Sequence, residues 1–120
     1  MKYLKEETLQ NRKGIVQKIA TPEGDKDLSV GLYVYLMMET YVPQQNFVLQ
    51  PAQMRLFNKV LDKLDEDPSK DGYWEFEDAE FAIVKQIFEN IAPRISMLNR
   101  YTPLVEDKLN GALNELPKKG

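Results

Sequence analysis

The feature that most limits the fold is an amphipathic segment that runs directly into an acidic, glycine-containing stretch. From about Pro51 to Leu64, apolar residues recur at the spacing of one helix face while polar residues take the opposite face. The apolar face consists of Met54, Phe57, Leu61 and Leu64. Pro51 also suits the first turn of a helix. The segment therefore predicts a helix that buries one side against other parts of the chain.

An earlier segment predicts a second helix of a different kind. It starts near Ser29 and runs to Tyr41, with Asp27 or Ser29 as its N-cap. Its interior, from Leu32 to Met38, is apolar or aromatic nearly all round. A helix without a polar stripe is buried centrally or covered by another chain.

Two more helices are predicted after the acidic stretch. One begins near Glu77 or Asp78, because carboxylates in a first turn cap the helix and oppose its dipole. It ends at Pro93. The last helix runs from Thr102 to Leu116, and a proline follows its first residue.

The N-terminal part of the chain reads as extended rather than helical. Asn11-Arg12-Lys13-Gly14 is a polar turn between apolar residues, which favours a short β-hairpin, and 21–26 reads as a loop. Tyr73 to Phe76 alternates like a short extended piece. The resulting fold class is mostly α: one compact bundle of about four helices with a short N-terminal β-hairpin. Residues 1–120 form one domain, with 1–20 extended and 27–116 as the helical core.

Composition excludes several classes of function. The 120 residues contain no cysteine and no histidine, which removes disulfides, thiol nucleophiles, zinc thiolate sites and the commonest general base. We therefore expect a non-enzymatic protein. The formal net charge of −3 makes nucleic acid an unlikely partner, because such binding favours a basic face. No run approaches the ~18 apolar residues of a membrane span or resembles a signal peptide, so a cytoplasmic location is expected.

The acidic stretch from Asp65 to Phe81 has two interpretations. The first is a single EF-hand-like calcium loop with Gly72 at the sixth position. Its oxygen ligands would come from Asp67, Ser69, Asp71, the carbonyl of Tyr73, Glu75 and Asp78. Trp74 at the eighth position, the short Asp78 at the twelfth and the lack of a second loop depart from the EF-hand pattern. The second interpretation is an ordinary turn between two helices.

The apolar helix also has two interpretations. Methionine is adaptable and tyrosine is enriched at interfaces, so this helix is a candidate surface for a protein partner or for self-association. The candidate interface residues are Tyr33, Tyr35, Met37, Met38 and Tyr41. The alternative is that the same side chains simply pack in the core.

The order of parts in the chain resembles a loose family of small, mostly uncharacterised tailed-phage and prophage proteins. The motifs that carry the resemblance are Asn11-Arg12-Lys13-Gly14, Gly24-Asp25 with Asp27-Leu28-Ser29-Val30-Gly31, Met54-Arg55, Trp74-Glu75-Phe76-Glu77-Asp78-Ala79-Glu80 and Ile83-Val84-Lys85. The resemblance covers roughly residues 9–113, and the insert at 65–72 departs from it. It implies a non-enzymatic phage protein that acts through protein contacts and carries no catalytic residue.

The sequence thus predicts a small protein-interaction or assembly protein, encoded by a phage or prophage. It would be found in the host cytoplasm or in the virion, and would work through a protein partner or self-association. The single calcium module is the first alternative, with calcium as its only cofactor. A small DNA-associated regulator that uses the second and third helices is the other alternative.

Overall fold

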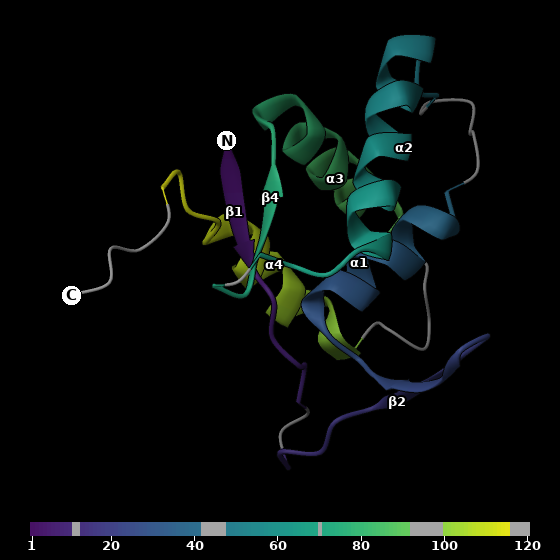
Figure 1. Ribbon diagram of the computed structural model, residues 1–120, viewed down its shortest axis with the longest axis vertical. Coiled ribbons are helices and arrows are strands. Elements are labelled where there is room, and N and C mark those ends of the chain that lie inside the picture. Colours follow the sequence, from purple (N-terminus) through teal and green to yellow (C-terminus); the bar gives the residue numbers. More distant parts are fainter. Residues whose placement is uncertain (11–12, 42–47, 70, 92–99, 116–120) are drawn as a thin grey trace.

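The computed structural model describes residues 1–10, 13–41, 48–69, 71–91 and 100–115. Within these ranges the chain forms four helices and two antiparallel, two-stranded sheets (Figure 1). In chain order the elements are β1 (Lys2–Lys5), β2 (Lys18–Thr21), β3 (Gly24–Asp27), α1 (Val30–Glu39), α2 (Pro51–Asp65), β4 (Tyr73–Phe76), α3 (Asp78–Ile91) and α4 (Thr102–Asn110). The predicted mostly α bundle is therefore wrong, and the fold is α+β.

The first sheet joins parts of the chain that are far apart in sequence. Strand β1 pairs antiparallel with β4, and Lys2 lies opposite Phe76. On its other side, Tyr3 forms a bridge with Leu113 through two backbone hydrogen bonds of 2.8 and 2.9 Å. The beginning, middle and end of the chain thus meet at β1. Local sequence patterns do not reveal such pairing, because its partners come from distant segments.

The second sheet is a β-hairpin, but it lies later in the chain than predicted. Strands β2 and β3 pair across the segment that was expected to be a loop. Pro22 and Gly24, which has a φ of +113°, occupy the second and fourth places of the connecting turn, and a type I turn favours these residues there. The predicted turn at 11–14 falls partly outside the described residues, although an isolated bridge joins Gln10 to Val16.

The predicted helix starts are confirmed. Ser29 caps α1 by accepting a 3.2 Å hydrogen bond from the backbone N–H of Leu32. Helix α2 begins at Pro51, α3 at Asp78 and α4 at Thr102. Each start carries a local signal, either a capping side chain, an early proline or an acidic first turn, and the same chemistry operates in the folded protein.

The predicted helix ends are less accurate. Helix α4 ends at Asn110, not at Leu116, because the chain turns at Gly111 and then pairs with β1. Helix α1 ends at Glu39, two residues earlier than expected. The predicted end of α3 at Pro93 lies outside the described residues.

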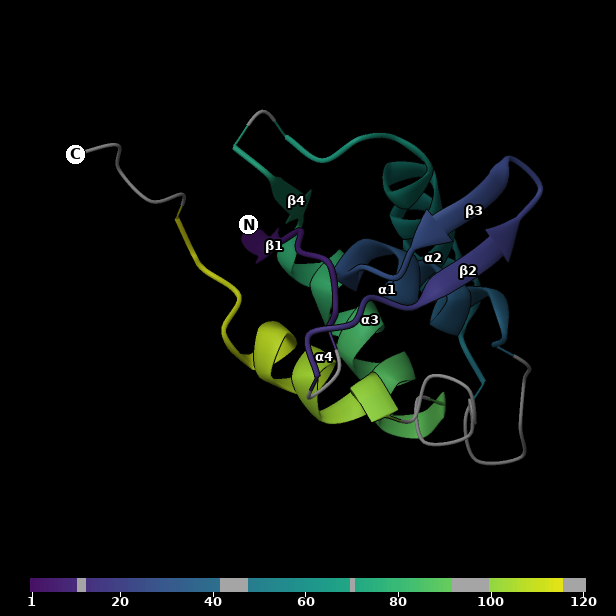
Figure 2. The ribbon, with the colours of Figure 1, turned by 90° about the horizontal axis from the view of Figure 1, so that it is seen from below.

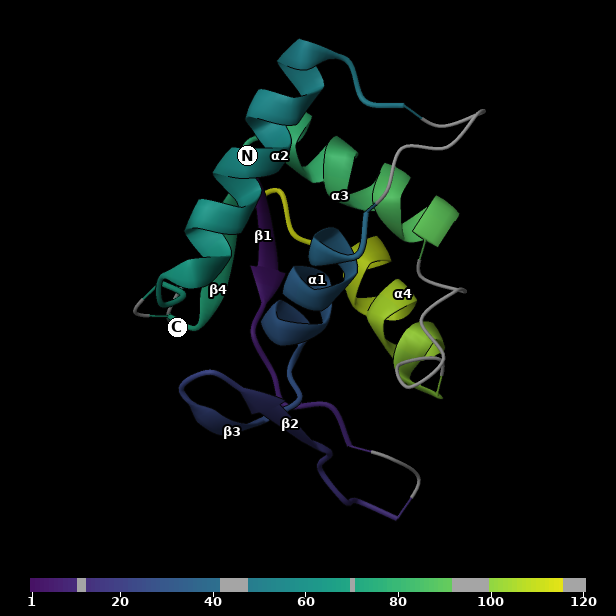
Figure 3. The same ribbon diagram turned by 90° about the vertical axis from the view of Figure 1, so that its right-hand side faces the viewer.

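Helix α1 occupies the centre of the molecule. It lies among α2, α3 and α4, and the β2–β3 hairpin lies to one side of this helical body, at the right in Figure 2 and at the bottom in Figure 3. The hydroxyl groups of Tyr33 on α1 and Thr102 on α4 are 3.0 Å apart and share a hydrogen bond. The buried core around α1 includes Leu4, Leu28, Val30, Val34, Val60, Phe76, Val84, Ile87 and Val105. Six of the ten residues of α1 are buried within this chain, as the core-packing alternative expects.

The start of α1 is in close contact with β4. A β-carbon placed on Gly31 would lie 2.6 Å from Cζ2 of Trp74 and 2.7 Å from Oε2 of Glu6. Both distances are far below van der Waals contact, so only glycine allows the indole and the helix to approach this closely.

We predict that Gly31→Ala destabilises the protein by about 1–3 kcal/mol, because the added methyl group forces the indole or the helix to move. Urea unfolding followed by circular dichroism measures this change. Asn58→Ala, at an exposed position of α2, is the control and should change the unfolding free energy by no more than ~0.5 kcal/mol. Equal stability of Gly31→Ala and wild type would contradict the close contact.

Candidate functional site: an acidic cleft beside the hairpin

The main candidate site is a cleft of about 390 Å³ between the β2–β3 hairpin and the helical body. One wall is the hairpin turn, the second is the end of α2 with the loop that follows it, and the floor is the start of α1 with Trp74. Its lining residues include Glu6, Thr21, Pro22, Glu23, Lys26, Asp27, Ser29, Gly31, Leu32, Tyr35, Leu64, Asp65, Glu66, Asp67, Pro68 and Trp74. The cleft thus joins four segments that are separate in the sequence.

The floor of the cleft is held by Glu6 and Ser29. The Glu6 carboxylate accepts a 3.0 Å hydrogen bond from the backbone N–H of Gly31 and a 3.1 Å bond from the Ser29 hydroxyl. The Ser29 hydroxyl oxygen in turn accepts from the N–H of Leu32. These contacts satisfy the free N–H groups of the first turn of α1 and place a negative charge against the positive end of its dipole. Glu6 is therefore a structural carboxylate.

Trp74 contributes an unpaired donor to the floor. Its side chain is only 6% exposed, and its indole Nε1 has no hydrogen-bond acceptor among the described residues. The nitrogen faces Gly31, within 2.7 Å of where a β-carbon would stand there. A buried donor without an acceptor costs about 1–3 kcal/mol. Such groups are uncommon in folded proteins and call for an explanation.

The α2 wall of the cleft carries three consecutive carboxylates, on Asp65, Glu66 and Asp67. Asp65 is the last residue of α2 and Glu66 is its C-cap. All three residues are exposed, and none forms an ion pair within the part of the chain that the structure describes. A helix C-terminus bears partial negative charge, so acidic groups there are unfavourable by a few tenths of a kcal/mol to ~1 kcal/mol each. This wall is electrostatically unfavourable in the isolated protein.

Tyr35 on α1 also lines the cleft and lies near carboxylates. Its hydrogen bond to Glu39, with smaller contributions from burial and from Asp65, raises the pKa of its phenol to about 12. The hydroxyl therefore stays protonated and remains a donor to carboxylates at any physiological pH. Tyr35 and Trp74 give the acidic cleft two aromatic surfaces.

The hairpin wall contributes one cation, which is already paired. Lys26 forms a 2.9 Å ion pair with Glu23, and Asp27 pairs with Lys18. The described residues that line the cleft therefore carry six carboxylates and one lysine: Glu6, Glu23, Asp27, Asp65, Glu66 and Asp67 against Lys26. The net charge of the whole chain is only −3, so the total charge does not reveal that acidic residues are concentrated in the cleft.

The residues of the predicted calcium loop are only partly brought together. The backbone N–H of Ser69 donates to the Tyr73 carbonyl at 2.9 Å, and the Ser69 hydroxyl oxygen accepts from the N–H of Tyr73. Gly72 has a φ of +82°, as a tight turn requires. The carbonyl expected at the seventh ligand position is therefore already used within the turn.

The carboxylates of that loop point to different neighbours. Asp78 accepts a 2.8 Å hydrogen bond from the Met1 amine, which holds the pKa of its carboxyl below the ordinary value. Glu75 lies on β4, Asp71 lies at the turn, and Asp67 lines the cleft. Among the described residues, no three acidic side chains are grouped so that they could hold a metal ion. The EF-hand interpretation stays a prediction.

The residues of the predicted interface helix divide into two groups. Tyr33, Met37 and Met38 are fully buried and pack inside this chain. Tyr35 and Tyr41 are half-buried; Tyr35 lines the cleft, and the Tyr41 hydroxyl accepts a hydrogen bond from the N–H of Leu49 at 3.0 Å. Of the predicted interface, only Tyr35 lies in the candidate site.

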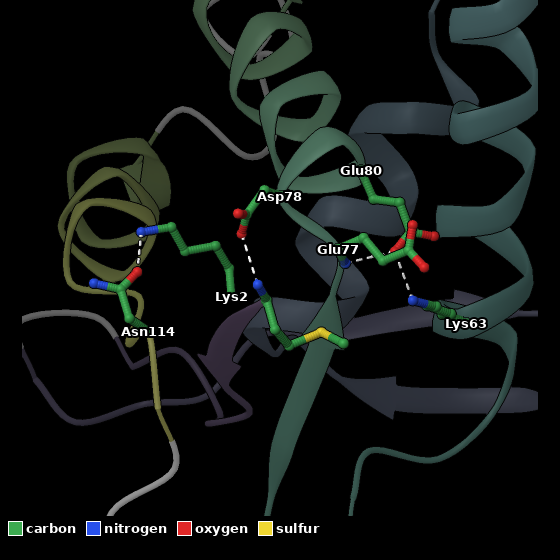
Figure 4. A network of polar contacts seen from close by, with 7 residues as sticks. Lys2, Lys63, Glu77, Asp78, Glu80 and Asn114 are labelled. Atoms are coloured by element: carbon green, nitrogen blue, oxygen red, sulfur yellow. Dashed lines mark hydrogen bonds and ion pairs between the residues drawn. The ribbon is translucent and has the colours of Figure 1, made fainter.

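A second charged cluster, at the start of α3, is structural (Figure 4). Glu80 is 1% exposed, and its carboxylate accepts hydrogen bonds from the Lys63 ammonium at 2.6 Å and from the Glu77 N–H at 2.7 Å. Lys63 also donates to the Glu75 carbonyl at 3.1 Å. The cluster therefore ties α2 to β4 and α3, and each charge within it has a partner.

Sequence reasoning missed most of the cleft. It assigned Asp67 to a calcium loop and Tyr35 to an interface, and it gave no role to Glu6, Asp65 or Glu66. One usable signal was present: three acidic residues follow the end of a clear helix, where basic residues are expected.

Comparisons with protein-family models, curated proteins and solved structures find no significant match to this chain. In addition, none of the helices in the described ranges has the length and apolar character needed to cross a bilayer. The case for a function therefore depends on the chemistry of the site itself.

Millimolar calcium should leave the melting temperature unchanged, because the Tyr73 carbonyl and the Asp78 carboxylate already have partners within the chain. Differential scanning fluorimetry with calcium and with a chelator measures this. A ligand present well above its Kd raises the melting temperature by mass action. A rise of several degrees that Asp67→Asn removes would instead support the EF-hand interpretation.

We also predict that Lys63→Met destabilises the protein by roughly 2–3 kcal/mol, because it leaves a buried carboxylate without its cation. Glu80→Gln keeps an acceptor at the same place and should be milder, at about 1 kcal/mol. Urea unfolding measures both changes. Lys59→Met, an exposed change on the same helix, is the matched control and should be nearly neutral. A loss no larger for Lys63→Met than for Lys59→Met would show that the pair contributes little.

Proposed function

We propose that this protein is a non-enzymatic binding protein that holds a protein partner between its β-hairpin and its helical body. The observation that carries the proposal is the hairpin itself. Of the residues in β2 and β3, only Ile19 is buried, and a two-stranded hairpin with so little burial is marginally stable by itself. An arm of this kind gains its contacts when a partner lies against it.

The base of the hairpin is firmly attached, so the arm has a defined position. The Leu28 N–H donates to the Gln17 carbonyl at 2.7 Å, and the Leu9 N–H donates to the Leu28 carbonyl at 2.8 Å. Leu28 itself is fully buried. The base of the arm is therefore fixed to the helical body, while the strands beyond the base have little burial to hold them.

The residue types of the cleft fit binding better than catalysis. The chain has no cysteine or histidine to act as nucleophile or general base near neutral pH. The carboxylates on the α2 wall are exposed, so the surface of a partner can reach them. From the resemblance to small phage proteins we infer that the partner belongs to a phage or prophage assembly, in the host cytoplasm or the virion.

The described contacts give less support to a DNA-associated regulator. A DNA-associated regulator would need a basic face for phosphates, whereas the main concave surface is acidic. Self-association remains one form of the same proposal, with a second copy as the partner.

We predict that a photo-crosslinking amino acid at Glu23, on the exposed hairpin turn, captures a discrete protein adduct in the native host. The same amino acid at Gln86, on the exposed face of α3, is the control and should capture none. Mass spectrometry identifies the adduct, and light scattering of the pure protein tests whether the partner is a second copy, which would appear as a multiple of 13.9 kDa. The same adducts at both positions, or none at Glu23, would refute a partner at the arm.

A further inference from the structure

We propose that the cleft binds a basic segment of the partner, with an arginine or lysine side chain inserted between the hairpin and the end of α2. This inference rests on the proposed function and adds the chemical class of the partner. It is drawn from three independent features of the cleft: its uncompensated charge, its aromatic floor and its size.

The uncompensated charge is concentrated on one wall. Asp65, Glu66 and Asp67 have no cation within the described chain and stand at the negative end of a 15-residue helix. The lysine in the last turn of that helix, Lys63, is directed to Glu80 instead. A cation from a partner would meet both the carboxylates and the C-terminal carbonyl groups of α2, which themselves favour positive charge.

The spacing of these carboxylates selects an extended cation. No three acidic side chains among the described residues are close enough together to hold a metal ion. A guanidinium group, by contrast, presents five N–H donors over a planar surface and can reach separate carboxylates at once. Exposed carboxylates spread along a wall match this geometry.

The floor suits the remainder of such a side chain. The half-buried Tyr35 offers an aromatic face for a guanidinium or ammonium group, with the small exposed part of Trp74 beside it. Pro22 and Pro68 offer apolar contact for the aliphatic stem. The unpaired Nε1 of Trp74 is a donor, which a carbonyl oxygen of the bound segment would satisfy after a small shift of the floor.

The size of the cleft limits what enters it. A volume of about 390 Å³ lies at the lower end of the range for small-ligand pockets. It accommodates one or two side chains and a short piece of backbone, not a folded domain. The rest of the partner would lie against the outside of the hairpin.

The test uses the only tryptophan of the chain as a reporter. The probe is the capped tetrapeptide acetyl-Gly-Arg-Arg-Gly-amide, titrated into the ¹⁵N-labelled full chain while the indole N–H resonance is followed by NMR. We expect a saturable shift of this resonance. The capped peptide with glutamate in place of arginine should produce none.

A charge-matched pair of variants separates the cleft from general electrostatics. Asp65→Asn with Asp67→Asn removes two carboxylates from the cleft, and Glu106→Gln with Asp107→Asn removes two from the exposed face of α4. Both pairs change surface residues and shift the net charge equally. We expect the cleft pair to weaken peptide binding by about fivefold or more, and the α4 pair to change it by less than about twofold.

Three outcomes would overturn the inference: an indole resonance that the arginine peptide does not move, an equal response to the glutamate peptide, or equal weakening by the two pairs of variants. The proposed function can be judged separately. Adducts at Glu23 without peptide binding would leave a partner at the arm but refute a basic segment in the cleft. Absence of both would refute both proposals.

Discussion

The burial of most of α1 is the constraint on which the rest of the fold depends. A helix that is apolar nearly all round needs cover on most of its sides, and six of its ten residues are buried, with α2, α3 and α4 packed against it. Trp74 on β4 lies against the start of the helix, and only a glycine at position 31 lets it come so near.

The close approach at Gly31 also shapes the cleft. The indole packs where a side chain at position 31 would stand, and Trp74 and Gly31 line the cleft together. Glu6 reaches the same point from the segment after β1 and neutralises the helix end. Core packing and the candidate site thus share residues. This explains why the site lies where four chain segments meet and not on a loop of its own.

The sequence predicted the starts of all four helices, because capping residues, early prolines and acidic first turns act locally. It did not predict the fold class. Strand β1 is short and charged, and its identity as a strand comes only from β4 and from the bridge to Leu113. The β2–β3 hairpin was not predicted, because Pro22 and Gly24 suggested a loop, while the hairpin turn predicted at 11–14 lies partly outside the described residues. Two cleft residues, Asp67 and Tyr35, were named as candidates for other sites. Their spacing along the chain does not reveal that they line the same cleft.

The position of β1 between β4 and the segment at Leu113 has a consequence for biosynthesis. During translation the ribosome completes β1 long before either of its neighbours exists. Strand β4 is made first and the segment at Leu113 later, so one edge of β1 stays unpaired until most of the described chain has been made. Contacts of such long sequence separation slow folding and leave strand edges open in the meantime. The charged ends of β1, Lys2 and Lys5, are the kind of residue that discourages pairing with foreign strands during that wait. The segment at Leu113, by pairing with Tyr3, covers the second edge of β1 and ends this vulnerable period.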